Sequence, residues 1–168
     1  FLCYIYMRFS APIIAYFFSV NNICKIYPLN NINTHIYHYK PQYDIYRYGS
    51  SNRKAYKKKN KYTGLVQDHH IIPKQWKNHN LIKTINFDIN SSNNLVIMPI
   101  PKTFLYFNFN PNLRTHYAGH PTYNLYVKKI LDFINKLDSL DDKKYYFWLF
   151  FTYLKKNCIY TNNNIPWI

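Results

Sequence analysis

The sequence predicts an α+β fold in which two short strands are followed by helices. Residues 65–73 contain an apolar pair at 65–66 and another at 71–72, and a proline at position 73 ends the run. This pattern favours a strand. Residues 95–98 form a second short apolar run that is also ended by proline. After Pro121, apolar side chains recur at helical spacing and predict an amphipathic helix to about Lys136. Its apolar positions are Val127, Ile130, Leu131, Ile134 and Leu137.

Turn and cap residues predict the secondary structure of the segments around these three elements. Residues 74–78 are expected to form a short helix because a proline stands at its start. The Asn-rich segments 84–92 and 102–115 are expected to be loops. Ser139 fits an N-cap and opens a helix over residues 140–156. That helix is apolar on nearly every side, so it is either the main core helix or the contact of a homodimer.

The composition divides the chain into four parts. Residues 1–45 form a poorly defined N-terminal leader or extension, 46–62 a basic linker or arm, 63–156 a domain with C-terminal helices, and 157–168 a tail. Within the first part, residues 7–20 combine one arginine with a short apolar run. This run resembles an export signal more than a membrane span. An intracellular location is favoured, and secretion through this run is the alternative.

Charge and cysteine content limit the classes of function. The 168 residues suit one domain, and 22 Lys and Arg against 7 Asp and Glu give a formal charge of +15. Such an excess attracts polyanions, with nucleic acid as the natural partner and an anionic membrane surface as the competing one. The aromatic share of 20% reflects either genomic base bias or platforms that stack on bases. The three cysteines form no C-x-x-C pair, which argues against a zinc knuckle or a disulfide framework.

The basic segment 46–62 interleaves cations with tyrosines. Gly49 to Asn52 are expected to interrupt regular structure there. Two compatible interpretations remain, a flexible linker and an arm that contacts phosphates. The candidate phosphate contacts are Arg47, Arg53, Lys54, Lys57, Lys58, Lys59 and Lys61.

Four histidines carry the candidate chemistry. His69 and His70 are adjacent in the first predicted strand, so their side chains are expected to point to opposite faces. His116 and His120 are four residues apart, a spacing typical of two ligands at a helix start. Imidazole acts as a base near neutral pH and also binds divalent metals, so both roles are open to this set.

Three sequence blocks occur in order: D-H-H-I-I-P at 68–73, N-N-L-V-I-M-P at 93–99 and H-x-x-x-H-P-x-Y-N at 116–124. Together they resemble the HNH, or His-Me finger, endonuclease superfamily, and in particular its AHH-type nuclease domains. The resemblance covers residues 62–137. It implies a ββα-metal core, in which a β-hairpin and a helix grip one divalent ion. Asp68 departs from the alanine usual in that branch.

The resemblance also implies residue roles. His70 would be the general base, and Asn94 would orient it by hydrogen bonding. His69, His120 and His116 would bind the metal. Asp68, which could also orient a ligand histidine, and Asn124 are weaker candidate ligands. The ion would be Mg²⁺, Mn²⁺, Zn²⁺ or Ni²⁺, with imidazoles favouring the softer ions.

The expected function is a metal-dependent endonuclease of low sequence specificity that acts on DNA more than on RNA and leaves 5′-phosphate ends. One alternative is a non-catalytic nucleic-acid-binding module on a degenerate HNH fold. The others are a secreted nuclease toxin and a membrane-surface protein that uses the +15 charge.

Overall fold

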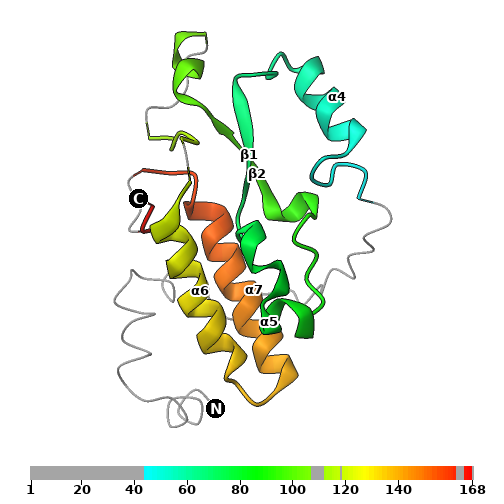
Figure 1. Cartoon of the computed structure of the whole chain (residues 1–168), viewed down its shortest axis with the longest axis vertical. Helices are drawn as coiled ribbons and strands as arrows, with labels where there is room; N and C mark the ends of the chain where they lie inside the picture. The colour runs from blue at the N-terminus through cyan, green and yellow to red at the C-terminus, as the bar shows by residue number, and fades with distance from the viewer. Residues whose placement is uncertain (1–43, 107–111, 118, 162–164, 168) are drawn as a thin grey trace, which may run out of the picture. The chain divides into compact units, whose positions relative to one another are not determined.

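The computed structural model describes residues 44–106, 112–117, 119–161 and 165–167. All of these belong to one compact unit, Lys40–Ile168. The predictions for the N-terminal leader and its apolar run therefore fall almost entirely outside the described residues. The elements, in chain order, are α4 (Ser51–Lys59), β1 (Val66–His70), η3 (Lys74–Asn78), α5 (Asn80–Thr84), η4 (Ser92–Asn94), β2 (Leu95–Pro99), η5 (Pro101–Leu105), α6 (Pro121–Asn135) and α7 (Leu140–Asn157) (Figure 1).

Strands β1 and β2 form a two-stranded antiparallel sheet, as the sequence predicted. The register pairs Val66 with Pro99 and His70 with Leu95. The two histidines of β1 point to opposite sides: His69 contacts the Tyr123 ring of α6, whereas His70 contacts the Tyr48 ring that precedes α4. The period-2 geometry of a strand thus separates two adjacent imidazoles into two environments.

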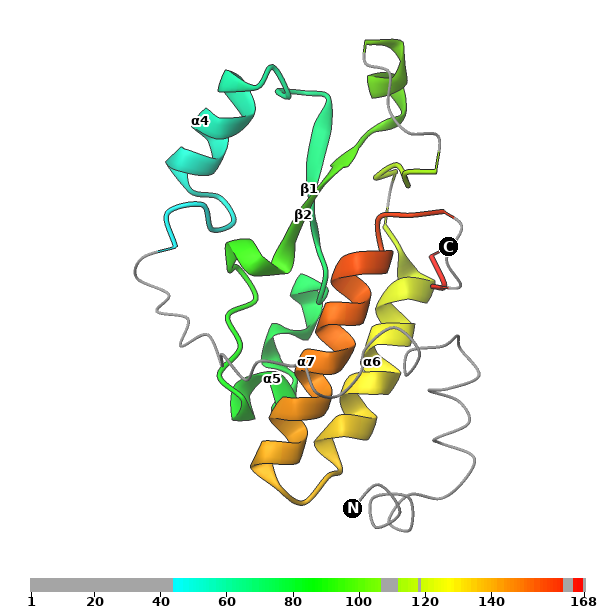
Figure 2. The ribbon, with the colours of Figure 1, turned by 180° about the vertical axis from the view of Figure 1, so that it is seen from behind.

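Helices α6 and α7 lie side by side and supply much of the core (Figures 1 and 2). Their bounds agree closely with the predicted ones. The buried face of α6 consists of Tyr123, Val127, Ile130, Leu131 and Ile134, at the spacing of an amphipathic helix. The Oγ of Ser139 caps α7 by accepting hydrogen bonds from the amides of Asp141 and Asp142. Phe147, Phe150, Phe151 and Leu154 of α7 are buried in this core.

The segment between the strands contains more helix than predicted. The short helix expected at 74–78 is present as η3, and α5 follows it over residues 80–84, most of which had no predicted structure. The Nδ1 of His79 caps α5 by accepting a hydrogen bond from the Leu81 amide at 3.2 Å. This helix packs against α6, and Leu81 and Ile82 are buried.

Residues 51–59 form helix α4, so the prediction that Gly49 to Asn52 would interrupt regular structure here is wrong. These residues instead begin the helix. Gly49 takes a φ of +80°, and the Ser50 side chain accepts a hydrogen bond from the Arg53 amide as the N-cap. The same small and polar residues that suggest a linker are therefore the start signal of a helix.

No helix within the described ranges combines the length and the apolar character needed to cross a bilayer.

Candidate metal centre and active site

The three predicted ligand histidines, His69, His116 and His120, lie together. Each offers a ligand atom, and these atoms are all within 4.8 Å of one another. We call these three residues the histidine trio. His69 comes from β1, His116 from the segment after η5, and His120 stands immediately before α6. Residues remote in sequence thus meet where the hairpin packs on the start of α6.

Backbone hydrogen bonds fix the members of the trio. The His116 amide donates to the carbonyl of Pro99 at 2.7 Å, which ties it to the end of β2. The His120 carbonyl accepts from the Asn124 amide at 2.9 Å and so begins the first turn of α6. The buried Tyr123 hydroxyl donates to the Ile71 carbonyl, which joins α6 to the chain just after β1.

Burial keeps the trio in the neutral form that binds metals. Burial and the neighbouring imidazoles lower the pKa of His69 to about 3, and burial with the nearby His116 and Arg114 lowers the pKa of His120 to about 4. Burial also lowers the pKa of His116, although Asp68 opposes this. Each member of the trio has one buried ring nitrogen without a hydrogen-bond partner among the described residues: Nε2 of His69, Nε2 of His120 and Nδ1 of His116.

Such unpartnered buried nitrogens fit a metal ion. Each costs about 1–3 kcal/mol if nothing compensates its lost hydration. A divalent cation accepts the lone pairs of several neutral imidazoles at once and removes this cost. The burial, the protonation state and the proximity of the trio therefore agree with the predicted ligand set.

Trp167 and Arg114 also belong to this region, and sequence reasoning missed both. The Trp167 ring centroid lies 4.1 Å from that of His120 and 4.9 Å from that of His69. Arg114 lies 4.9 Å from the Trp167 ring and donates from Nη2 to the Ile165 carbonyl at 3.1 Å. Part of the predicted tail therefore packs on the trio. No spacing or motif in the sequence indicated this contact.

His70 has a separate environment on the other face of β1. Its ring centroid lies 4.6 Å from that of Tyr48, and its Nε2 has no hydrogen-bond partner in the part of the chain that the structure describes. Burial and the charge of Lys74 lower the pKa of His70, whereas Asp68 and the side chain of Asn90 act in the opposite direction. A neutral imidazole with an unpartnered nitrogen can accept a proton.

The side chain of Asn94 holds the backbone that follows β1 rather than the His70 ring. Its Oδ1 accepts from the Ile72 amide at 2.8 Å, and its Nδ2 donates to the carbonyls of Ile72 at 3.0 Å and Ile89 at 2.8 Å. Asn94 is completely buried. The hydrogen bond to the base that the resemblance implies is replaced here by an indirect arrangement, in which Asn94 fixes the chain two residues beyond His70.

Replacement of Asn94 by alanine is expected to lower the free energy of unfolding by about 3 kcal/mol. The change leaves three buried backbone groups without partners, at about 1 kcal/mol or more each. Urea denaturation measures this loss. The neighbouring exposed Asn93 is the matched control, and Asn93→Ala is expected to change stability by less than about 0.5 kcal/mol. Equal losses of stability in the two variants would contradict this role of the Asn94 side chain.

The structure does not bring the two weaker candidate ligands into the trio. Asp68 forms ion pairs with Arg53 at 2.7 Å and with Lys57 at 2.7 Å. The Nδ2 of Asn124 donates to the Oε1 of Gln75 at 3.4 Å. Because neighbours along a strand alternate, Asp68 shares its face of β1 with His70 rather than with His69. Asp68 therefore joins α4 to the hairpin.

Asp68 provides a prediction with a defined pH dependence. Burial of the carboxyl raises its pKa, but Arg53 and Lys57 outweigh this, and the folded-state pKa lies below the ordinary value of 3.8. The ion pairs therefore stabilise the fold above the unfolded-state pKa and lose this effect as the pH falls through the folded-state pKa. Asp68→Asn is expected to cost about 3 kcal/mol at pH 7, because it leaves the buried Arg53 unpaired. The cost should shrink at acid pH, where the wild-type carboxyl is protonated as well.

The prediction is tested by measuring the urea midpoints of the wild type and Asp68→Asn at pH 7 and at the lowest pH at which both proteins remain folded. A stability difference that stays constant over the whole range would contradict an ionic role for Asp68.

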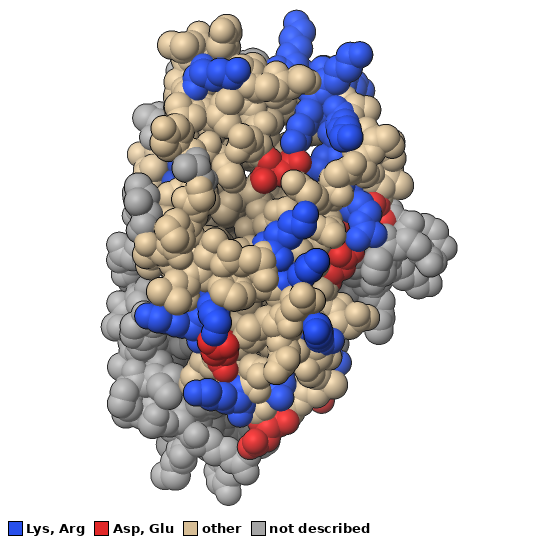
Figure 3. Space-filling model, viewed as in Figure 1, with Lys and Arg blue, Asp and Glu red and all other residues tan. Residues whose placement is uncertain are grey.

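The predicted phosphate contacts divide into two groups. Arg47 pairs with Asp88 at 3.0 Å, while Arg53 and Lys57 pair with Asp68, and Arg53 is buried. The remaining four are exposed: Lys54, Lys58, Lys59 and Lys61. In Figure 3 the Lys and Arg atoms are densest over the region where Figure 1 draws α4. Helix α4 thus carries a basic surface, although Arg53 contributes to internal packing.

Comparison with known protein families gives one match. The sequence model of one protein family matches residues 50–145, more than half of the 168-residue chain. Its description is a nuclease family of the HNH/ENDO VII superfamily with conserved AHH. The matched range includes α4, the hairpin, the trio and α6. Comparisons with curated proteins and with solved structures found no match.

Proposed function

The chain belongs to the AHH nuclease family of the HNH/ENDO VII superfamily, and from this premise we propose that it is a metal-dependent endonuclease that hydrolyses phosphodiester bonds. DNA is the favoured substrate over RNA, and sequence specificity is low. The observation that carries the proposal is the histidine trio, which lies on the side of β1 to which His69 points, while His70 points to the other side. One member of the metal-binding set, His69, is therefore adjacent in sequence to the proton acceptor His70.

In this proposal, His70 takes a proton from the attacking water. Its Nε2, which has no hydrogen-bond partner among the described residues, and a pKa lowered chiefly by burial support this role, because the ring is neutral near pH 7. Asn94 keeps the backbone after His70 in place. His69, His116 and His120 would hold one divalent ion. When bound, the ion supplies electrostatic stabilisation of the charge that develops on the phosphate and the leaving oxygen.

The donor set bears on the identity of the ion. Three imidazole ligands favour Zn²⁺, Ni²⁺ or Mn²⁺ for tight binding, whereas Mg²⁺ prefers oxygen ligands. The exposed lysines of α4 support binding through the phosphate backbone, which carries no sequence information. Both features fit a nuclease that cuts with little sequence preference and is inhibited steeply by salt.

The experiment that tests the proposal combines the full chain with plasmid DNA and with RNA, in separate reactions containing Mg²⁺, Mn²⁺, Zn²⁺, Ni²⁺ or EDTA. Cleavage of DNA in at least one metal and none in EDTA is the expected result, with 5′-phosphate ends on the products. A folded, metal-loaded protein that binds DNA and cleaves neither substrate would overturn the proposal in favour of a non-catalytic binding module.

A further inference from the structure

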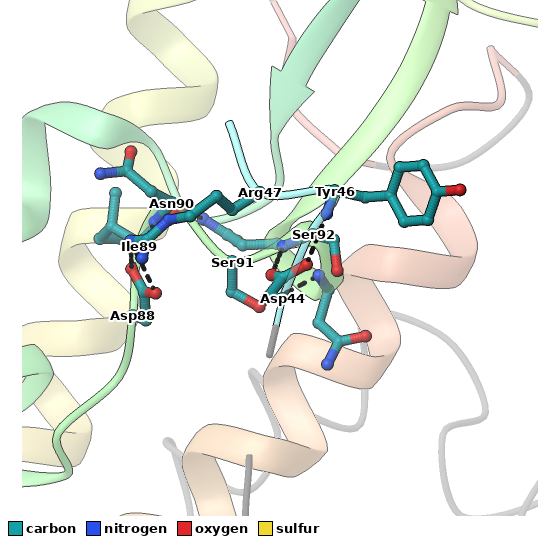
Figure 4. Close-up of polar contacts among 10 residues, drawn as sticks. Asp44, Tyr46, Arg47, Asp88, Ile89, Asn90, Ser91 and Ser92 are labelled. Carbon is teal, nitrogen blue, oxygen red and sulfur yellow. Dashed lines mark hydrogen bonds and ion pairs between the residues drawn. The ribbon is translucent and has the colours of Figure 1, made fainter. Parts of the chain in front are cut away.

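Tyr48 is held in a defined position beside His70. Its backbone amide donates to the Asn90 carbonyl at 2.8 Å. The preceding Arg47 forms two hydrogen bonds to Asp88, at 3.0 and 3.3 Å. Figure 4 shows how this segment, from Asp44 onward, is bonded to the loop that precedes and enters η4. The position of the Tyr48 ring is therefore built by several long-range contacts.

The ring of Tyr48 does not behave as a core residue. The residue is 41% exposed, although its ring contacts His70. The Nζ of Lys74 lies 5.0 Å from the centre of the same ring. An exposed aromatic ring with a cation beside it, next to the candidate general base, resembles a surface that receives a ligand more than one that stabilises the fold.

A hollow of about 430 Å³ lies next to this group. Its lining is formed by Lys74, Lys77, Phe87, Asp88, Ile89 and Asn90. The only carboxylate in the lining, Asp88, is paired with Arg47. Lys74 and Lys77 have no carboxylate partner within the part of the chain that the structure describes. The hollow therefore presents two uncompensated ammonium groups, and its volume lies within the range of pockets that bind small ligands.

We propose that Tyr48, Lys74 and Lys77 form a subsite for the nucleotide that adjoins the scissile phosphate. The two lysines bind the oxygens of a backbone phosphate, and the exposed Tyr48 ring contacts the base or sugar. This inference rests on the proposed nuclease function and extends it, because it separates binding of the neighbouring nucleotide from chemistry at the cleaved bond. It assigns binding of the neighbouring nucleotide to residues outside helix α4.

Two substrates distinguish this subsite from the reaction centre. One is a labelled oligodeoxynucleotide, which has neighbouring phosphates, and the other is bis(p-nitrophenyl) phosphate, which has none. The full chain is assayed with the metal that supports cleavage. For the oligonucleotide, Lys74→Gln combined with Lys77→Gln is expected to raise KM about tenfold and to lower the salt slope by about 1 per lysine. Tyr48→Leu is expected to raise KM about fivefold.

At about pH 8.5, where an imidazole with the ordinary pKa of about 6.5 is neutral with or without the charge of Lys74, the same variants should hydrolyse bis(p-nitrophenyl) phosphate within about twofold of the wild type. Lys136→Gln is the control, because Lys136 is an exposed cation at the far end of α6 from His120. An oligonucleotide KM and a salt slope that match those of this control would overturn the subsite and leave the nuclease function standing. Equal losses on both substrates would also overturn it, because Tyr48 and the lysines would then act through His70. A wild type inactive on both substrates would instead refute the nuclease function itself.

Discussion

Replacement of His70 by alanine is expected to lower the rate of DNA cleavage by about 10²–10⁴-fold, the usual contribution of a positioned general base. The reason is local. His70 is the imidazole whose free Nε2 lies on the β1 face away from the trio, and the variant has nothing at that position to accept the proton of the attacking water. Initial rates of plasmid nicking at equal metal concentration measure the effect.

The control for this variant is its metal binding. Because His70 is not part of the trio, His70→Ala should bind Zn²⁺ or Ni²⁺ as the wild type does. His79→Asn provides a second control. This histidine caps α5 and pairs with Asp132 at 2.9 Å, and asparagine retains the capping function. A His70→Ala protein that cleaves within about twofold of the wild type would contradict the assignment of the base.

The elements predicted correctly are those that depend on local patterns. Strand β2 ends at a proline and β1 ends three residues before one, α6 follows the spacing of its apolar residues, and α7 begins just after the serine expected to cap it. The proximity of His69, His116 and His120 followed from the resemblance, since no periodicity relates a strand histidine to two others about 50 residues later. The fold of residues 63–156 was therefore largely accessible from sequence.

The features that sequence reasoning missed depend on tertiary partners. Arg53 belongs to a basic run, yet the fold buries it against Asp68. The position of Trp167 on the trio depends on Arg114, about 50 residues earlier, which binds the backbone near it. Tyr48 stands beside His70 in a segment that the Arg47–Asp88 ion pair and the Tyr48 amide bond to Asn90 hold against a loop about 40 residues later. A composition rule treats these residues as solvated charge or filler, because their partners lie far away in sequence.

Replacement of His120 by alanine is expected to weaken metal binding by at least about 100-fold. Loss of residues that only support a ligand typically costs 10–100-fold, so the loss of a direct ligand should cost at least as much as the upper value. Isothermal titration with Zn²⁺ or Ni²⁺ measures the affinity. Cleavage should fall in parallel, and excess metal should restore part of it.

Thermal unfolding gives a second measure that does not depend on activity. A ligand that binds only the folded state at 100 times its Kd stabilises it by about 2.7 kcal/mol, so metal should raise the Tm of the wild type and EDTA should reverse the change. His120→Ala should lose this response, whereas His79→Asn and His70→Ala should keep it. Because the unpartnered nitrogens of the trio are buried, they destabilise the metal-free fold, and binding relieves that cost. A metal response that persists in His120→Ala would locate the ion elsewhere and would remove the trio from the mechanism.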